Sequence, residues 1–175
     1  MNIRKKCKID SSLKEEVSFG SNTNAFVYYE LVIESVIMAY MALEAFLNEH
    51  IPEDYECWSN RRSERILEAS NNEKIERHFT NEEKITIILP EVLCVESPKG
   101  RSKAWENYKK LHNLRNRLVH MKTLDRRSSG PETETIWDSL LKVEAPHRLS
   151  KSIIDYFIKR MPNPPEWYNK CPIRA

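Results

Sequence analysis

Glycine is scarce in this 175-residue chain, which has only Gly20, Gly100 and Gly130. That leaves no material for a glycine-rich phosphate loop or a dinucleotide-binding fingerprint, because both need several closely spaced glycines. Runs of alternating β-branched residues are also few, and five of the nine prolines lie in the last thirty residues. The composition therefore favours a helical protein, and the length is that of one domain.

Cysteine and histidine are present but are not grouped as metal ligands. The four cysteines are widely spaced and form no C-x-x-C or zinc pattern, which indicates free thiols in a reducing compartment. His50, His78 and His147 also lie apart. We therefore expect no metal and no other cofactor. The opening stretch MNIRKKCKIDSSLKEE has no apolar run typical of a signal peptide, so the expected location is the cytoplasm.

Charge is unevenly distributed along the chain. Residues 99–127 contain ten Lys or Arg and two acidic residues, so this segment carries +8 and the rest of the chain −6, for a total of +2. A concentrated basic segment is the electrostatic footprint expected for a phosphate-bearing partner. A solvated helix face that keeps the protein soluble would have the same charge, so charge alone leaves both interpretations open.

One long apolar run, LVIESVIMAYMALEAFL at residues 31–47, raises the question of a membrane span. The run is shorter than a typical span, and it contains Glu34 and Glu44, whose charges are costly in lipid. A helix that is apolar on nearly all sides must be covered on nearly all sides. The better prediction is a buried central helix, with no contact with the membrane.

Local signals divide the chain into a loose segment (1–21), a helical domain (22–161) and an irregular proline-rich tail (162–175). Thr80 and Glu83 have the spacing of a capping box, Ser102 is suited to cap a helix, and Pro146 is a favoured first-turn residue. Residues 52–60, 96–102 and 124–134 are expected to be loops. The predicted fold is an all-α, up-and-down bundle of four to five helices; we expect them at about 24–48, 61–70, 80–95 with a break at Pro90, 103–123 and from 146 on.

The helix expected at 103–123 carries the most informative stretch, LRNRLVH at residues 114–120. At about 100° per residue its apolar face contains Leu111, Leu114, Leu118 and Met121. His120 lies nearly opposite, beside Asn116, and Arg115 lies on the flank. Asn116 and His120 are four residues apart, so their side chains can meet. We expect His120 to face solvent, a cleft or a second subunit rather than the core.

The residues RNRLVH resemble the R-x4–6-H motif of the HEPN superfamily (higher eukaryotes and prokaryotes nucleotide-binding domains), in which Asn often follows the Arg. Two further stretches are similar to helices of that family: AYMALEAFLNEHI at residues 39–51 and EEKITIILPEVL at residues 82–93. The resemblance covers about residues 24–160. It implies a metal-independent endoribonuclease, usually a homodimer whose motif helices meet, and often a member of a toxin–antitoxin or anti-phage defence system with an antitoxin or defence partner protein.

The residue types suit that chemistry. RNA carries its own nucleophile, the 2′-OH, and a histidine such as His120 can move its proton near neutral pH. Arg115 offers a permanently charged fork to the phosphoryl oxygens, and Asn116 could orient the imidazole or bind the phosphate. Such a reaction leaves 2′,3′-cyclic phosphate ends. The alternative is a non-catalytic HEPN-like module that dimerises and binds RNA, nucleotide or a protein partner.

Other residues are weaker candidates for the site. Glu44 could contact Arg115 or line a cleft, although a structural ion pair is also open, and His112 could assist or be an ordinary exposed histidine. Trp105 and Tyr108 could stack on bases, although helix residues near a core more often pack within it. Six basic side chains on this helix and shortly after it could hold the RNA backbone; these are Lys109, Lys110, Arg117, Lys122, Arg126 and Arg127.

Overall fold

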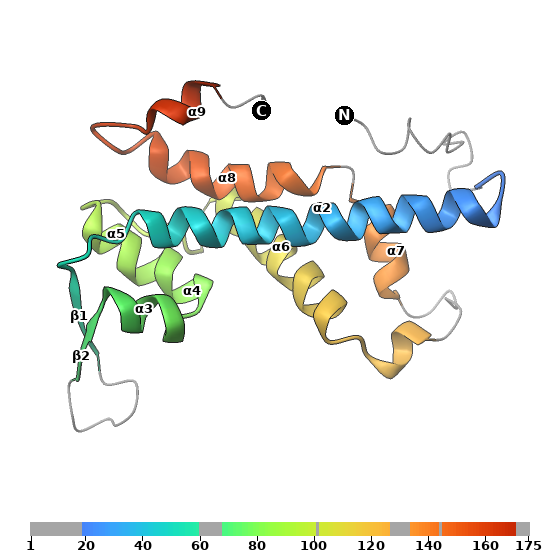
Figure 1. Ribbon diagram of the computed structural model, residues 1–175, viewed down its shortest axis with the longest axis horizontal. Helices are drawn as coiled ribbons and strands as arrows, with labels where there is room; N and C mark the ends of the chain where they lie inside the picture. Colours follow the sequence, from blue (N-terminus) through green and yellow to red (C-terminus); the bar gives the residue numbers. More distant parts are fainter. Residues whose placement is uncertain (1–18, 60–67, 101, 127–133, 144, 171–175) are drawn as a thin grey trace.

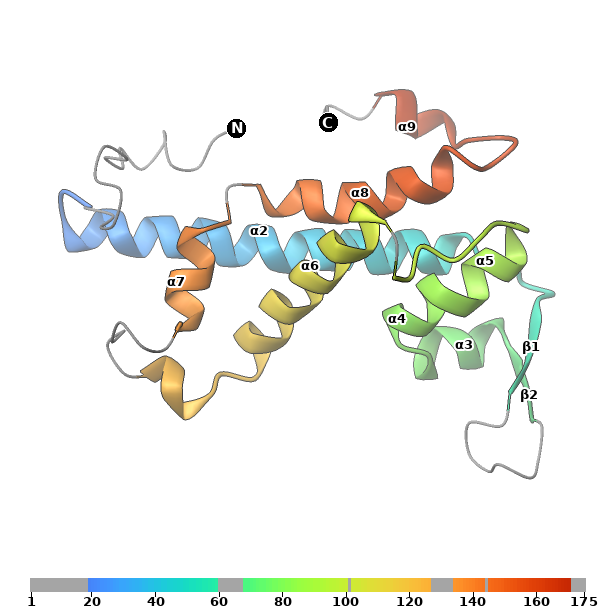
Figure 2. The same cartoon turned by 180° about the vertical axis from the view of Figure 1, so that it is seen from behind.

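Helices dominate the structure, and the all-α character expected from composition is confirmed. The computed structural model describes residues 19–59, 68–100, 102–126, 134–143 and 145–170. Its longest element is α2 (Asn22–Glu49), and the shorter helices are arranged along it (Figure 1). Seen from behind, α6 (Lys103–Val119) crosses in front of α2, and α8 (Pro146–Ile158) runs beside it (Figure 2).

The helix α2 is buried on one side only. It begins at Asn22, two residues before the predicted start, and the side chain of Ser21 accepts a hydrogen bond from the Asn24 N–H at 3.2 Å. Its buried face includes Val36 and Leu43, both fully covered. The expectation that the helix is covered on nearly all sides is wrong for the described part of the chain. Met38 and Met41 are 63% and 56% exposed, because the partners of α2 pack against its other side.

The helix α8 packs against both α2 and α6 and completes the core. It begins at Pro146, as predicted, and it buries Ile153 and Phe157. Full burial of one such side chain contributes about 1.5–3 kcal/mol. On the other side of α8, Lys151 and Asp155 form an ion pair at 2.7 Å across one turn. The sequence pattern of α8, apolar on one face and charged on the other, therefore matches its position.

The segment after α2 differs from the predicted loop and polar helix. It contains an antiparallel pair of strands, β1 (Glu56–Ser59) and β2 (Glu68–Asn71), with Cys57 opposite Ser70. Part of the helix expected at 61–70 lies outside the described residues, and its last residues belong to β2. Pairing between distant residues stabilises such strands, so local propensity does not reveal them. A further helix that was not predicted, α3 (Asn72–His78), follows directly.

The next helical stretch has the predicted start and an irregular middle. The capping box of Thr80 and Glu83 is confirmed at the start of α4 (Asn81–Glu83). A π-helical segment, η1 (Lys84–Ile88), then leads into α5 (Leu89–Val92). Pro90 has no N–H to donate to a carbonyl of the preceding turn. The helical hydrogen-bond pattern is therefore irregular in the turn before Pro90 rather than at the proline itself.

The described last part of the chain contains three short helical elements that the sequence did not predict. The 3₁₀ turn η2 (Thr123–Arg126) and α7 (Ile136–Leu141) flank residues 127–133, which lie outside the described part. The tail expected to be irregular contains α9 (Glu166–Lys170). The loose segment expected at 1–21 lies almost entirely outside the described residues. None of the described helices has the length and apolar character needed to cross a bilayer.

Candidate functional site

The helix α6, which carries the sequence motif, is shorter than expected. It begins where predicted, with the Ser102 side chain accepting from the Trp105 N–H at 3.2 Å. It ends at Val119 rather than near residue 123, and His120 is its C-cap residue, with its N–H donating to the Asn116 carbonyl. Met121 therefore lies beyond the helix and is 45% exposed, so its predicted place in the core is wrong.

The buried face of α6 is also rotated relative to the prediction. Leu111 and Leu114 are buried as expected, but Leu118 is only half-buried and Tyr108 is fully buried. Including Tyr108 turns the centre of the buried face by about 45° at 100° per residue. This rotation carries Arg115 and His112 toward α2. Tyr108 is thus a core residue rather than an exposed platform for a base.

Asn116 links Arg115 to His112. Nη1 of Arg115 donates to Oδ1 of Asn116 at 3.1 Å, and Nδ2 of Asn116 lies 2.8 Å from Nε2 of His112. A guanidinium has only donors, so the amide atom that faces it must be the oxygen. The amide NH₂ therefore faces His112, whose Nε2 must accept and carry no proton. The side chain of Asn116 thus orients His112, four residues before it, rather than His120.

The other side of the His112 ring is held by tyrosines. Its Nδ1 lies 3.3 Å from the Tyr40 hydroxyl and 3.5 Å from that of Tyr108. Burial lowers the pKa of His112, the charge of Lys109 lowers it further, and Glu82 opposes both. His112 is therefore a half-buried, neutral residue with its proton on Nδ1, and it is not the exposed helix histidine that the sequence also allowed.

Tyr40 joins this group from α2 and was not predicted as a site residue. The guanidinium of Arg115 lies over its ring, with Cζ 5.0 Å from the ring centroid. Burial raises the pKa of the Tyr40 hydroxyl, which therefore stays protonated at neutral pH. We call Tyr40, His112, Arg115 and Asn116 the polar network. It connects the middle of α2 to the end of α6.

His120 lies in an open hollow at the end of α6. The hollow has a volume of about 560 Å³, and the side chain of His120 is exposed. We call it the motif hollow; its lining residues are Asn113, Asn116, Arg117, His120 and Lys122. The structure thus brings Asn116 and His120 to one hollow. Arg115 does not line it, because its side chain is turned toward Tyr40.

Arg117, expected to bind RNA, is engaged within the protein. Its Nη2 donates to Oδ1 of Asp125 at 2.6 Å, and its Nη1 donates to Ser139 at 3.3 Å. The Asp125 side chain is fully buried. Burial alone would raise the pKa of Asp125, but hydrogen bonds from the Ile136 N–H, the Lys122 N–H and Arg117 outweigh it and lower the pKa. The Arg117–Asp125 pair therefore fastens η2 and α7 to α6.

The remaining basic candidates differ in whether their side chains already have partners within the protein. Lys109 lies 3.7 Å from Glu82 and near the ring of Trp105, whereas Lys110 and Lys122 are exposed. The side chain of Arg126 and all of Arg127 fall outside the described part of the chain. Lys110 and Lys122 are therefore the predicted cations best placed to meet a phosphate.

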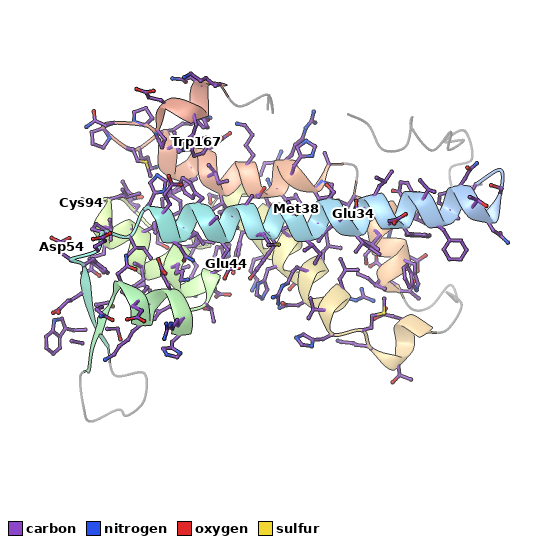
Figure 3. All side chains as sticks on the ribbon, viewed as in Figure 1. Glu34, Met38, Glu44, Asp54, Cys94 and Trp167 are labelled. Carbon is purple, nitrogen blue, oxygen red and sulfur yellow. The ribbon has the colours of Figure 1, made fainter. Side chains whose placement is uncertain are left out.

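Glu44 is exposed on α2, where Glu34 and Met38 are also exposed (Figure 3). Its charge acts on Lys84, a fully buried lysine that the sequence did not single out. The ammonium of Lys84 donates to Oδ1 of Asn48 at 2.7 Å and to the Glu76 carbonyl at 3.1 Å. Burial lowers the pKa of Lys84, and Glu44 opposes that shift. This lysine joins η1 to α2 and α3.

Comparison with known proteins identifies no relative: no family profile, no curated protein and no solved structure matches the chain. Among the described residues, no three His, Cys, Asp or Glu side chains gather as a metal site would require. What the site can do therefore follows from its own residues. His120, Asn116 and Lys122 line one open hollow, and the guanidinium of Arg115, outside the hollow, is bonded to the amide of Asn116.

Proposed function

We propose that the chain is a metal-independent endoribonuclease of the HEPN superfamily, which cleaves RNA by attack of the 2′-OH on the adjacent phosphate. One observation carries the proposal. The Asn116 side chain lines the hollow that contains His120, and the same side chain is bonded to Arg115. His120, a group that can transfer a proton, and an amide bonded to a fixed positive charge thus line the same hollow. These are the two functions that this reaction requires.

In the proposed reaction, His120 takes the proton of the 2′-OH, and the 2′-oxygen forms a bond to phosphorus. The bond from phosphorus to the 5′-oxygen breaks, and that oxygen receives a proton from the protonated His120 of a second copy of the chain. The products are a 2′,3′-cyclic phosphate and a 5′-hydroxyl. Charge builds up on the non-bridging oxygens in the transition state, and the amide N–H of Asn116 that does not face His112 stabilises it, while Arg115 acts through the amide that it polarises. His112 holds the amide in place and takes no part in proton transfer, because its Nε2 is occupied by Asn116.

A homodimer through the ends of α6 is part of the proposal. One His120 per chain is few for both acid and base roles, and a two-fold axis would place a second motif opposite the first. Val119, directly before His120, is 52% exposed, and Met121, directly after it, is 45% exposed. Exposed apolar side chains next to His120 in the chain suit a contact between two copies. The toxin–antitoxin or anti-phage defence setting is proposed from the family resemblance alone.

The proposal is tested with wild-type protein and the variants His120→Ala and His112→Gln, each incubated with end-labelled single-stranded RNA and with tRNA in excess EDTA. We expect wild type to leave cyclic phosphate ends and His120→Ala to be inactive. His112→Gln should keep part of the activity, because glutamine can still accept from Asn116. An all-2′-deoxy oligonucleotide must resist cleavage. Equal cleavage by wild type and His120→Ala would contradict the assignment. Binding of RNA without cleavage by any of the three proteins would favour the non-catalytic module.

A further inference from the structure

A second, smaller hollow lies directly beside the motif hollow. Its volume is about 220 Å³, and residues of α6, of α7 and of the positions that flank α7 line it. We call it the lateral hollow; its lining residues are Lys110, Asn113, Leu114, Arg117, Glu134, Ser139 and Lys142. Asn113 and Arg117 line both hollows, so the two share a border. A ligand in one hollow can therefore continue into the other.

The shared border runs along one stripe of α6. Lys110, Asn113 and Arg117 are spaced by three and four residues, and His120 follows after three more. At 100° per residue these four positions fall within about 80° of one another. At 1.5 Å per residue they cover about 15 Å of helix length, which is longer than one phosphate group. The stripe is polar throughout, and it points away from the buried face that contains Leu111.

The cations at the two ends of the stripe are available to a ligand. Lys110 is exposed, and the ammonium of Lys142 lies 2.9 Å from the Glu134 carboxylate, with 68% of the lysine side chain exposed. An exposed ion pair of this kind is weak, so a phosphate can draw the ammonium of Lys142 away from Glu134 at little cost. At the other end, Lys122 lines the motif hollow. Arg117, held by Asp125 and Ser139, lines both hollows.

We propose that the lateral hollow binds a backbone phosphate of the nucleotide next to the one that is cut. The RNA strand then lies along α6, from Lys122 past Asn113 to Lys110 and Lys142. The identification of the ligand as RNA rests on the proposed function. Phosphate contacts position a strand without reading its sequence, so this hollow sets the register of the cleaved bond rather than base preference. Lys142 and Asn113 thereby join the binding surface that the sequence predicted.

The test uses His120→Ala protein, which keeps the RNA intact, and compares it with the triple variant that also carries Lys110→Ala and Lys142→Ala. Binding of a labelled single-stranded dinucleotide and octanucleotide is measured by fluorescence anisotropy at several salt concentrations. We expect the triple variant to bind the octanucleotide roughly tenfold more weakly, with a salt slope smaller by about 0.7, the value for one phosphate of a single strand. Dinucleotide binding, which needs only the motif hollow, should be unchanged. The octanucleotide of DNA should show the same loss, because the contact is to phosphate.

Two control variants show whether the loss of binding comes from the lateral hollow itself. Lys110→Arg with Lys142→Arg should restore binding, and Lys159→Ala, which removes an exposed lysine at the end of α8, should not change it. Equal weakening for the dinucleotide, or none for the octanucleotide, would overturn the inference. Tight binding of ADP that depends on Lys110 and Lys142 would make the hollow a mononucleotide site and overturn it as well. This experiment measures binding and not cleavage. A failure of the ribonuclease proposal would therefore not change its outcome, and a failure of the lateral hollow to bind phosphate would not decide whether the protein cleaves RNA.

Discussion

The amide of Asn116 donates to Nε2 of His112 over 2.8 Å, and this contact fixes the protonation state of the imidazole. Arg115 binds the amide oxygen at 3.1 Å and so prevents the amide from turning over. If His112 gained a proton on Nε2, two donors would face each other. The position of Arg115 is therefore coupled through one amide to the neutral form of His112.

The first consequence is that His112 titrates below the ordinary histidine pKa of about 6.5. Burial lowers the pKa of His112, as does Lys109. In ¹⁵N NMR spectra we expect the His112 ring to be the Nδ1–H tautomer at pH 7, with a titration midpoint below that of the same residue in urea-unfolded protein. The folded state favours neutral His112, so its contribution to stability is complete above pH 6.5 and is lost as the pH falls through the folded pKa. A midpoint above 6.5 would be incompatible with the polar network.

A substitution of Asn116 should reverse that preference. In Asn116→Asp the carboxylate still accepts from Arg115, but it also requires a donor from His112. We therefore expect the pKa of His112 to rise above 6.5 in this variant, and the same NMR titration measures it.

Asn116→Ala should lower RNA cleavage about 100-fold, because one donor to the developing charge is lost and Arg115 is released. Unchanged cleavage by Asn116→Ala would remove Asn116 from the proposed site.

The sequence predicts the motif helix and its first residue but not the direction in which its side chains point. The predicted apolar face is centred on Leu111, Leu114, Leu118 and Met121. The helix ends before Met121, and the fully buried Tyr108 turns the core face toward α2. The partners of a tyrosine on another element are not visible in the local pattern of α6. This single residue explains why His112 belongs to the polar network and why Arg115 points away from the hollow of His120.

Long helices with clear caps were predictable, and short elements held by distant contacts were not. Ser21, Thr80 and Ser102 cap their helices through bonds within four residues, so the signal is local. In contrast, η2 and α7 depend on Asp125, which accepts from the Ile136 N–H eleven positions later at 2.7 Å. No spacing of residues in the sequence indicates that a carboxylate will have this role. In the sequence, Asp125 is simply one of two acids in a basic segment.

Asp125 should be the most sensitive charged residue for stability. Asp125→Asn removes the charge that pairs with Arg117 and should lower the free energy of unfolding by about 3 kcal/mol. The folded pKa of Asp125 is lowered, so its stabilisation is complete above the ordinary pKa of about 4 and is lost as the pH falls through the folded value. The difference between wild type and variant, measured by urea unfolding, should therefore be constant near neutrality and shrink below pH 4. Glu134→Gln, in an exposed pair, should cost under about 1 kcal/mol. An equal cost for both variants would mean that burial of Asp125 has no energetic role.

The proposed dimer distinguishes two exposed apolar surfaces. Val119 lies at the end of α6 beside His120, whereas Met38 lies on the side of α2 turned away from its packing partners. We expect Val119→Glu to shift the protein from dimer to monomer in size-exclusion chromatography with light scattering and to lower RNA cleavage. The reason is that two like charges would face each other across the two-fold axis. Met38→Glu carries the same change in charge and should leave both mass and cleavage unchanged. If Met38→Glu alone abolished the dimer, the contact would lie on α2, and the two motif hollows would not share a cleft. Each His120 would then have to serve without a second copy opposite it.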